Sequence, residues 1–226
     1  MRRREAFAAQ TPLSAKEGCN ALKKSIGVLD TTLRDGAQSA SVSYTVKDKL
    51  KILDILDALG IGFAEAGAPA AVAKDEELFL LLKRERVRFR TLKPVAFHST
   101  CREGVAACED ELLKKAVALA DEYVSLYGKS SLAQVVSVIR TSGDENLRMI
   151  ADSVAYCREN GKRVIFEGEH FFDGFRADPD YALQTLVAAV NAGAERVVLC
   201  DTNGGCFPDE IERITAEANR LFPGMI

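Results

Sequence analysis

Residues 163–200 read RVIFEGEHFFDGFRADPDYALQTLVAAVNAGAERVVLC, and they contain one full repeat of the pattern that decides the fold. An apolar run opens the stretch, a polar loop and an amphipathic segment follow, and a second apolar run closes it. Continuous apolar runs of this length suit strands that are buried on both faces. Asp178-Pro179 is typical of a helix N-cap followed by proline at the first helical position, and Gly193 of a left-handed cap at the helix end. The stretch therefore predicts a strand, a helix and a second strand.

The same unit recurs along the chain from residue 26 onward. We expect strands at residues 26–30, 62–66, 91–97, 123–127, 163–167 and 196–200. The segments between them carry apolar residues at the 3.6-residue period of a helix, as in the stripe formed by Leu147, Ile150, Val154 and Cys157. Thr45 to Asp48 resembles a capping box, which predicts a helix start there.

Six alternations of strand and helix predict a parallel sheet with helical crossovers. The two common architectures are an open doubly wound sheet and an eight-stranded (β/α) barrel. No GxGxxG or GxxxxGK[ST] motif follows the first strand, which disfavours a nucleotide-binding open sheet. Polar residues instead follow the carboxyl ends of the strands, where barrel enzymes place their chemistry. These residues are Arg34, Asp35, His98 to Arg102, Lys129, Ser130, Glu169, His170 and Asp201 to Asn203.

The spacing of the strands predicts how much of a barrel is present. The expected strands start about 34 residues apart, and eight such units would reach about residue 300. The expected architecture is thus a (β/α)8 TIM barrel, truncated after the sixth unit, with residues 26–226 as a partial catalytic domain. We expect residues 1–25 to be a disordered lead-in. Their basic start suggests a targeting segment, but Glu5 and Glu17 are atypical of a transit peptide.

Composition excludes several classes of function. The 226 residues are 47% hydrophobic and 28% charged, with a net charge of −3, which gives no basic surface for nucleic acid. No apolar run approaches the roughly 20 residues of a membrane span. The six cysteines contain no CxxC pair, so we expect reduced thiols and a cytoplasmic location.

The loop after the first expected strand reads Asp30-Thr31-Thr32-Leu33-Arg34-Asp35-Gly36-Ala37-Gln38. At a barrel mouth a carboxylate such as Asp35 can bind a hard divalent cation, and a guanidinium such as Arg34 can stabilise an oxyanion. A simple salt bridge between the two is the alternative. Because both residues lie on a loop, we expect their loss to have little effect on stability.

The string DTTLRDG-x-Q resembles the signature of the pyruvate-carboxylase-like metal barrels, which include isopropylmalate, homocitrate and citramalate synthases and hydroxymethylglutaryl-CoA lyase. Further segments look most like the citramalate synthase branch, and the resemblance runs from about Ile26 to Pro223. These segments are Gly128-Lys129-Ser130, Asp144 to Ile150, Glu169-His170-Phe171-Phe172-Asp173-Gly174 and Leu199 to Gly205.

The resemblance implies a role for individual residues. Arg34 matches the catalytic arginine of the family and Asp35 its metal-binding aspartate. Glu169 matches a glutamate that holds and polarises the substrate, and Thr202 a threonine that contacts the keto-acid carboxylate. We expect Gln38 beside the metal site and Asn203 beside Thr202, both supporting substrate binding.

Some features depart from the family pattern or have a simpler explanation. Residues 65–70, Glu-Ala-Gly-Ala-Pro-Ala, replace a Gly-Gly-Trp-Pro-Gly-like stretch, and Gln134 stands where a histidine is usual. The His-x-His pair with which the family completes its metal site does not occur in this sequence. His170 is either a donor that supports the site or a packed histidine, whereas His98 is better explained as a packed one. Lys129 either faces the pocket or is a surface lysine, and Cys200 and Cys206 are explained as buried thiols.

The resemblance implies an acyltransferase that condenses acetyl-CoA with a 2-keto acid, most simply pyruvate to citramalate, in isoleucine and leucine biosynthesis. A divalent cation, Mn²⁺, Mg²⁺ or Zn²⁺, is the implied cofactor, and the complete protein is expected to be a homodimer. A related acyl-CoA lyase of the hydroxymethylglutaryl-CoA lyase kind is the alternative, as is a catalytically incompetent fragment.

Overall fold

The computed structural model describes residues 26–226, so the expected lead-in at residues 1–25 lies outside the described residues. The strands are β1 (Leu29–Asp30), β2 (Phe63–Gly67), β3 (Lys93–Ser99), β4 (Tyr123–Lys129), β5 (Arg163–Glu169) and β6 (Arg196–Leu199). The α-helices are α1 (Val46–Ala58), α2 (Ala73–Arg84), α3 (Glu111–Leu119), α4 (Leu132–Gln134), α5 (Gly143–Glu159), α6 (Phe171–Ala177), α7 (Pro179–Asn191) and α8 (Pro208–Leu221). Short turns of other helix types are η1 (Gly36–Gln38), η2 (Ala107–Glu109) and the π-helical η3 (Val135–Ile139).

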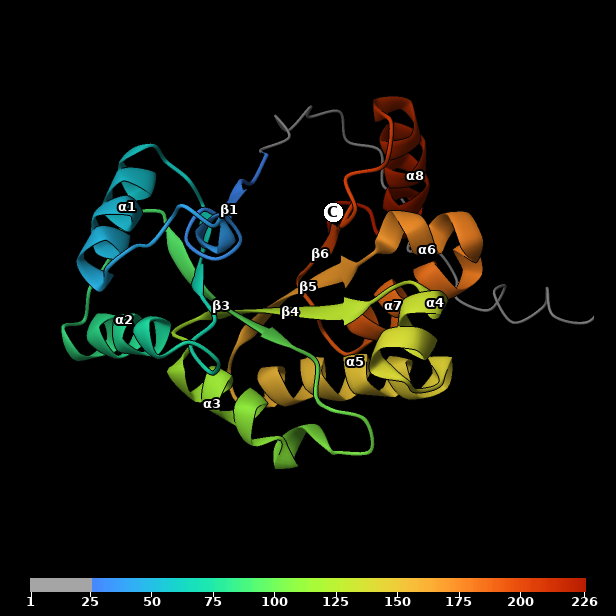
Figure 1. Ribbon diagram of the computed structural model, residues 1–226, viewed down its shortest axis with the longest axis horizontal. Coiled ribbons are helices and arrows are strands. Elements are labelled where there is room, and N and C mark those ends of the chain that lie inside the picture. Colours follow the sequence, from blue (N-terminus) through green and yellow to red (C-terminus); the bar gives the residue numbers. More distant parts are fainter. Residues whose placement is uncertain (1–25) are drawn as a thin grey trace, which may run out of the picture.

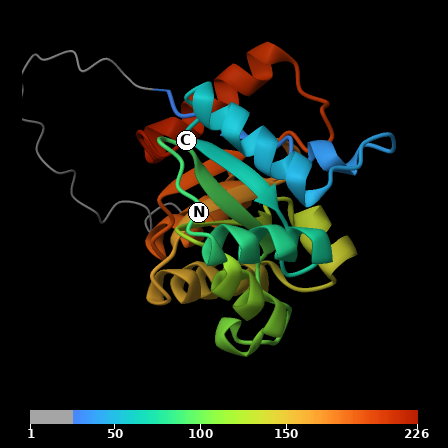
Figure 2. The same ribbon diagram turned by 90° about the vertical axis from the view of Figure 1, so that its left-hand side faces the viewer.

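The six strands form one parallel sheet in the order β1-β2-β3-β4-β5-β6. Each strand pairs with its neighbours in sequence, which is the connectivity of a barrel; a doubly wound sheet would reverse direction at a switch point. The sheet curves, and the helices lie on its outer side (Figure 1). Figure 2 looks at the β1 side and shows α1 and α2 on this outer face. The predicted architecture, six consecutive units of a (β/α)8 barrel, is confirmed.

The strand boundaries differ from the predicted ones in the middle of the sheet and at its β1 edge. Strands β3, β4 and β5 each run two residues further, so that Lys129 and Glu169 pair within the ladder instead of following it. Strand β1 covers only two residues of the predicted 26–30, because it pairs with β2 alone. Hydrophobic periodicity indicates where a strand is buried, whereas the ladder of hydrogen bonds decides where it ends.

The predicted helix signals are confirmed at α1 and α7. The Thr45 side chain accepts a hydrogen bond from the Asp48 backbone N–H, and Asp48 accepts one from Thr45 in return, which completes the capping box. Asp178 caps α7 by accepting from Tyr181 N, with proline at the first position. None of the described helices has the length and apolar character needed to cross a membrane.

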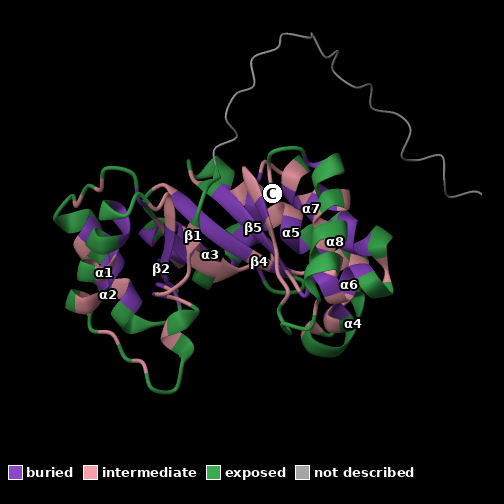
Figure 3. Cartoon of the chain, turned by 90° about the horizontal axis from the view of Figure 1, so that it is seen from above, coloured by how far each residue is buried: buried purple, intermediate pink, exposed green. Residues whose placement is uncertain are grey.

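Two apolar clusters lie on opposite faces of the sheet. The larger one fills the space between the strands and the outer helices, and Figure 3 shows buried segments in both. Ile150, Val154 and Cys157 of the predicted stripe belong to this cluster, whereas Leu147 is half-buried. The smaller one, Val95, Tyr123 and Ile165 with three neighbouring side chains, lies on the inner face. The inner positions nearer the carboxyl ends of the strands carry polar side chains instead, and they form the candidate site.

Candidate functional site

A buried lysine ties the loop after β1 to the rest of the barrel. Lys49 of α1 is 3% exposed, and its Nζ donates to Leu33 O at 2.8 Å and to Ala66 O at 3.1 Å. The same Nζ lies 2.5 Å from Asp75 Oδ1 on α2. One ammonium thereby joins the loop, β2 and α2, and it fixes the backbone next to Arg34.

The close approach of α2 to the end of β2 requires a glycine. Gly67 has φ +147°, and a Cβ at this position would lie 2.3 Å from the Asp75 carboxylate. Asp75 Oδ2 also accepts a hydrogen bond from Ala68 N at 2.9 Å. This contact accounts for the glycine in the 65–70 stretch that departs from the family pattern.

Arg34 lies among three carboxylates and one aromatic ring. Its Nε is 2.5 Å from Glu65 Oε2, its Nη1 is 3.0 Å from Asp35 Oδ1, and its Nη2 is 3.8 Å from Glu167 Oε2. The guanidinium carbon lies 4.0 Å from the centre of the Phe97 ring, a cation–π contact. Burial by itself would lower the pKa of Arg34, but Glu65, Glu167 and Asp35 together outweigh burial, and the pKa of Arg34 is raised.

The Arg34 side chain is only 16% exposed, whereas that of Asp35 is 64% exposed. Although both residues lie on the loop, the Arg34 side chain is largely buried and only Asp35 is exposed. The reason is that Glu65 points inward from β2, directly beneath the loop, and draws the guanidinium into the barrel.

Glu65 and Glu167 form the floor of the site. Glu65 is fully buried, and burial, followed by the nearby Glu167 carboxyl group, raises the pKa of Glu65 to about 9. Glu167 is 6% exposed and accepts a hydrogen bond from Ser125 Oγ on the neighbouring strand.

Glu169 ends β5 two residues after Glu167 and points to the same side of the sheet. Lys129, its partner in the β4 ladder, places Nζ 2.6 Å from Glu169 Oε2. The Lys129 side chain is 15% exposed, so it is a partly buried member of the site and not a surface lysine. Asn146 of α5 holds the backbone at Lys129, because its side-chain amide donates a hydrogen bond to Lys129 O at 2.9 Å.

The turn after β6 is connected to the start of α6. Thr202 Oγ1 accepts a hydrogen bond from His170 N at 2.8 Å, and His170 has the left-handed φ of 57°. Asp173 Oδ2 accepts a hydrogen bond from Asn203 Nδ2 at 2.6 Å, and the same oxygen lies 3.1 Å from His170 Nδ1. His170 is thus buried and also donates a hydrogen bond to the Thr202 turn, so it is both packed and a support of that turn.

These side chains surround a cavity of about 510 Å³ at the carboxyl ends of the strands. It is lined by Arg34, Asp35, Gln38, Phe97, Tyr127, Glu167, Glu169, Cys200, Asp201 and Thr202. Five of the six candidate residues from the sequence therefore meet at one cavity. Asn203 is not among its lining, because its amide is bound to Asp173.

Sequence reasoning missed several residues of the site, above all Glu65, Glu167, Phe97 and Tyr127. Glu65 and Glu167 had a usable signal, since each is an acidic residue that directly follows an apolar run within its strand. Phe97 and Tyr127 stack with ring centroids 5.0 Å apart, and as aromatic strand residues they are indistinguishable from ordinary core.

His98, Cys206 and Gln134 do not line the cavity. His98 alternates with the inward Phe97 and so points to the other face of β3, where burial lowers its pKa. Cys200 does line the cavity, and burial raises its pKa to about 12, which makes it an unreactive thiol.

Asp35 is the single metal ligand that the sequence predicts within this chain. Among residues 26–226, no three His, Cys, Asp or Glu side chains are arranged to hold a metal ion. The Asp35 carboxylate is instead paired with Arg34. The described residues alone therefore do not form a complete cation site.

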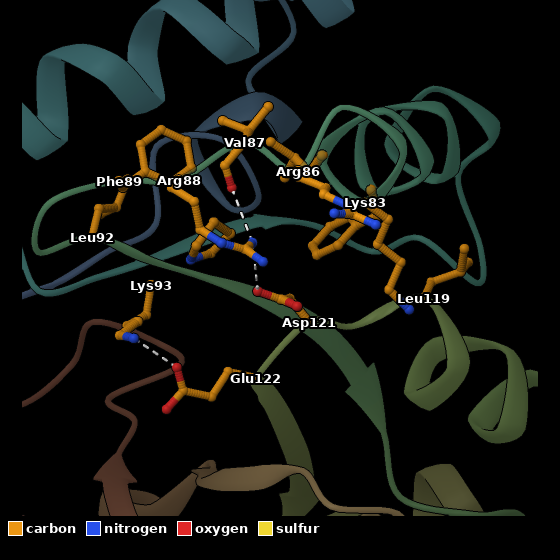
Figure 4. Close-up of a pocket in the computed structure, with 13 residues that line it drawn as sticks. Lys83, Arg86, Val87, Arg88, Phe89, Leu92, Lys93, Leu119, Asp121 and Glu122 are labelled. Carbon is orange, nitrogen blue, oxygen red and sulfur yellow. Dashed lines mark hydrogen bonds and ion pairs between the residues drawn. The ribbon is translucent and has the colours of Figure 1, made fainter.

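A second cavity, of about 270 Å³, lies at the opposite, amino end of β3 and β4 (Figure 4). Three of its cations are matched by nearby acceptors. Lys93 is 2.7 Å from Glu122, Arg88 is 4.0 Å from Asp121, and Lys83 donates to the carbonyl of Ala118. The Lys83 contact caps the carboxyl end of α3, so this cluster has a structural explanation.

A curved parallel β/α sheet with converging polar side chains at the carboxyl ends of its strands defines the class of β/α-barrel enzymes. Within this class the chain belongs to the HMGL-like family, whose model matches residues 25–223. The fold is similar to hydroxymethylglutaryl-CoA lyases of Bacillus subtilis and Pseudomonas aeruginosa. Each has a TM-score of 0.68, at 16% and 20% identity, over 88% of this chain and 66% and 65% of those chains.

Sequence similarity points to the synthases of the family. The chain is 46% identical to an (R)-citramalate synthase of Synechocystis sp. over 88% of its length, and 45% identical to that of Streptomyces coelicolor over 86%. A homocitrate synthase of Sulfolobus acidocaldarius is 31% identical over 89% of the chain. The chain spans 36% of the length of the two citramalate synthases and 41% of that of the homocitrate synthase. The predicted resemblance to the citramalate synthase branch is confirmed.

Proposed function

We propose that the protein containing this chain is an acyltransferase that condenses acetyl-CoA with pyruvate to form citramalate. The observation that carries the proposal is the difference in identity, 40–46% to citramalate synthases against 30–31% to homocitrate synthases. Similarity to the lyases is 16–20% and bears on the fold alone. Isoleucine biosynthesis, a cytoplasmic location and a homodimeric state belong to the same proposal.

The cavity suits this chemistry through Arg34. Attack of an acetyl-CoA enolate on a keto group turns the carbonyl oxygen into an oxyanion, which a fixed guanidinium stabilises. Nε and Nη1 of Arg34 are bound to Glu65 and Asp35, whereas Nη2 has no hydrogen-bond partner within residues 26–226. We assign the free Nη2 donors to the substrate oxygen.

Glu169 and Thr202 lie on the opposite wall, at the ends of β5 and β6. We assign the Thr202 hydroxyl to the keto-acid carboxylate, to which it can donate while accepting from His170 N. Glu169, held by Lys129, is assigned to positioning the acyl substrate. Gln38 lies on the Arg34 side of the same cavity and is assigned to substrate binding, with Asn203 supporting the Thr202 turn through Asp173.

We propose Asp35 as one ligand of a divalent cation, Mn²⁺, Mg²⁺ or Zn²⁺. Such an ion, when bound, polarises the keto-acid carbonyl. The exposed carboxylate of Asp35 is a suitable oxygen ligand, but the other ligands are not found among the described residues. Substrate, water or other parts of the protein would have to supply them.

The test is a panel of 2-keto acids assayed by CoA release, with the protein carrying this chain in full. Pyruvate is expected to be preferred over 2-ketoisovalerate and 2-oxoglutarate. Preference for either of the latter would contradict the assignment of pyruvate while leaving the condensation reaction in place. Absence of CoA release with every keto acid would contradict the acyltransferase itself.

A further inference from the structure

Two buried carboxylates share a single cation at the floor of the cavity. Glu65 Oε2 is 2.5 Å from Arg34 Nε, and Glu167 Oε2 is 3.8 Å from Arg34 Nη2. Among residues 26–226, Arg34 is the only cation within ion-pair distance of either acid. The two acids come from strands β2 and β5, which have two other strands between them in the sheet.

The hydrogen bonds of the two acids are incomplete unless one of them carries a proton. Ser125 donates to Glu167 Oε1, and Arg34 donates to Glu65 Oε2. Glu65 Oε1 is buried and has no partner among the described residues. A proton between the two acids supplies the missing hydrogen bond, and a buried oxygen without a donor is costly.

The charge balance of the site leads to the same result. Two ionised carboxylates against one guanidinium would leave an uncompensated negative charge in a buried place, which is strongly unfavourable. One retained proton makes the group of three neutral. The next ionisable groups do not change this balance, because Glu169 is paired with Lys129, and the Cys200 and Tyr127 side chains have pKa values raised by burial. Asp35 is a further anion, but it lies at the exposed side of Arg34.

We propose that Glu65 and Glu167 hold one proton in common and act together as a positioning pair for Arg34. Their single net negative charge binds the guanidinium through Nε, against the ring of Phe97. Because the second acid is neutralised, it does not draw Nη2 into a full ion pair, and the Nη2 donors stay available at the cavity. This last step depends on the proposed function, whereas the shared proton does not.

Infrared spectroscopy of the purified chain tests the shared proton without any substrate. We expect a protonated carboxylic acid C=O band near neutral pH that shifts on deuteration. The band should disappear in both Glu65→Gln and Glu167→Gln, because the remaining acid then ionises to balance Arg34. The matched control is Glu169→Gln, another carboxylate of the cavity, which should retain the band. Absence of the band in the unmodified chain, or its persistence in both floor variants, would overturn the proposal.

The pH dependence of stability gives a second, independent measurement. An acid whose pKa is raised in the folded state keeps a proton that the unfolded chain releases above its pKa of about 4.3. The stability contributed by the pair is therefore complete below that pH, and it falls as pH rises toward the folded pKa of about 9. For one proton the folding equilibrium constant changes about tenfold per pH unit. Between pH 6 and 9 this decline should be absent from either single glutamine variant, and an unchanged slope in both would contradict the shared proton.

Activity measurements test whether Glu65 and Glu167 position Arg34 or only contribute to stability. Each single glutamine variant still has one floor carboxylate for Arg34, whereas Glu65→Gln/Glu167→Gln keeps only the exposed Asp35 as a partner among the described residues. The loss of kcat in the double variant should therefore exceed the product of the single losses by about tenfold or more. A purely additive result would contradict the positioning role. If the protein releases no CoA from any substrate, the proposed function fails, but the infrared and stability results still decide the shared proton.

Discussion

Arg34 shows how a loop residue becomes part of a barrel interior. Its guanidinium is held from below by Glu65, at the side by Asp35 and on one face by Phe97. These contacts leave few orientations open, so little reorganisation is needed when charge develops on a substrate oxygen. They also mean that Arg34 neutralises buried acids, which gives it a structural role in addition to the proposed catalytic one.

Replacing Arg34 or Asp35 by alanine tests both roles. In the protein carrying this chain in full, each variant is expected to lower turnover by at least about 100-fold, the scale for loss of one oxyanion donor. Their stabilities should differ. Arg34→Ala leaves Glu65 without its cation and should lower the melting temperature, whereas Asp35→Ala removes an exposed pair of little energetic value.

Arg84→Ala is the control for these variants, because Arg84 is 74% exposed and, among residues 26–226, pairs only with the exposed Glu85. It should change neither CoA release nor the melting temperature. Turnover at the unmodified rate in Arg34→Ala or Asp35→Ala would disprove the role assigned to that residue.

At the scale of elements, the end of β2 is where three segments meet. Lys49 connects the Arg34 loop to β2 and to Asp75 of α2, and Gly67 lets α2 approach the strand end. The position of Arg34 therefore depends on the packing of two helices as well as on its own loop. A change at this junction should affect the site although it touches no substrate.

Gly67→Ala tests this junction. The new Cβ would lie 2.3 Å from the Asp75 carboxylate. The alanine would also have to adopt a φ of +147°, which is unfavourable for a residue with a side chain. Gly104 has a left-handed φ of +67° and open space around it, so Gly104→Ala carries a backbone penalty of about 1–2 kcal/mol without any steric contact. In urea denaturation Gly67→Ala should lose more stability than Gly104→Ala. Equal losses would show that the contact between Gly67 and Asp75 is not a tight one.

At the scale of the whole molecule, the six strands form an incomplete barrel. Strands β1 and β6 are the edges of the sheet, each with one partner strand in the part of the chain that the structure describes. Apolar residues near the β1 edge are exposed, with Ile26 at 90% and Val28 at 47%. Edges of this kind favour association with another chain.

The 226-residue chain by itself is therefore expected to associate, to bind Mn²⁺ or Mg²⁺ weakly, and to release no CoA from acetyl-CoA and pyruvate. Weak binding is expected because Asp35 alone offers few ligands, and affinity comes from several converging ones. Light scattering and isothermal titration check both properties. Val28→Lys, which places a charge at the β1 edge, should reduce association. Stoichiometric micromolar metal binding by a monodisperse monomer would contradict this view.

The sequence by itself determined the order of strands and helices, the caps at Thr45 and Asp178, and the grouping of Arg34, Asp35 and Glu169 at one end of the sheet. These features depend on periodicity and on the capping preferences of single residues, which act over a few neighbouring positions. Parallel strands then carry their carboxyl ends to one edge without further information.

Only the tertiary structure decided that Glu65 and Glu167 converge beneath Arg34, and that Arg34 is buried as a result. The two acids are about a hundred positions apart in the sequence, on strands that are not neighbours in the sheet. Their contact with one guanidinium depends on the register of the intervening strands and on the curvature of the sheet. Both properties arise from the summed packing of side chains across several strands, and no local pattern of residues encodes them.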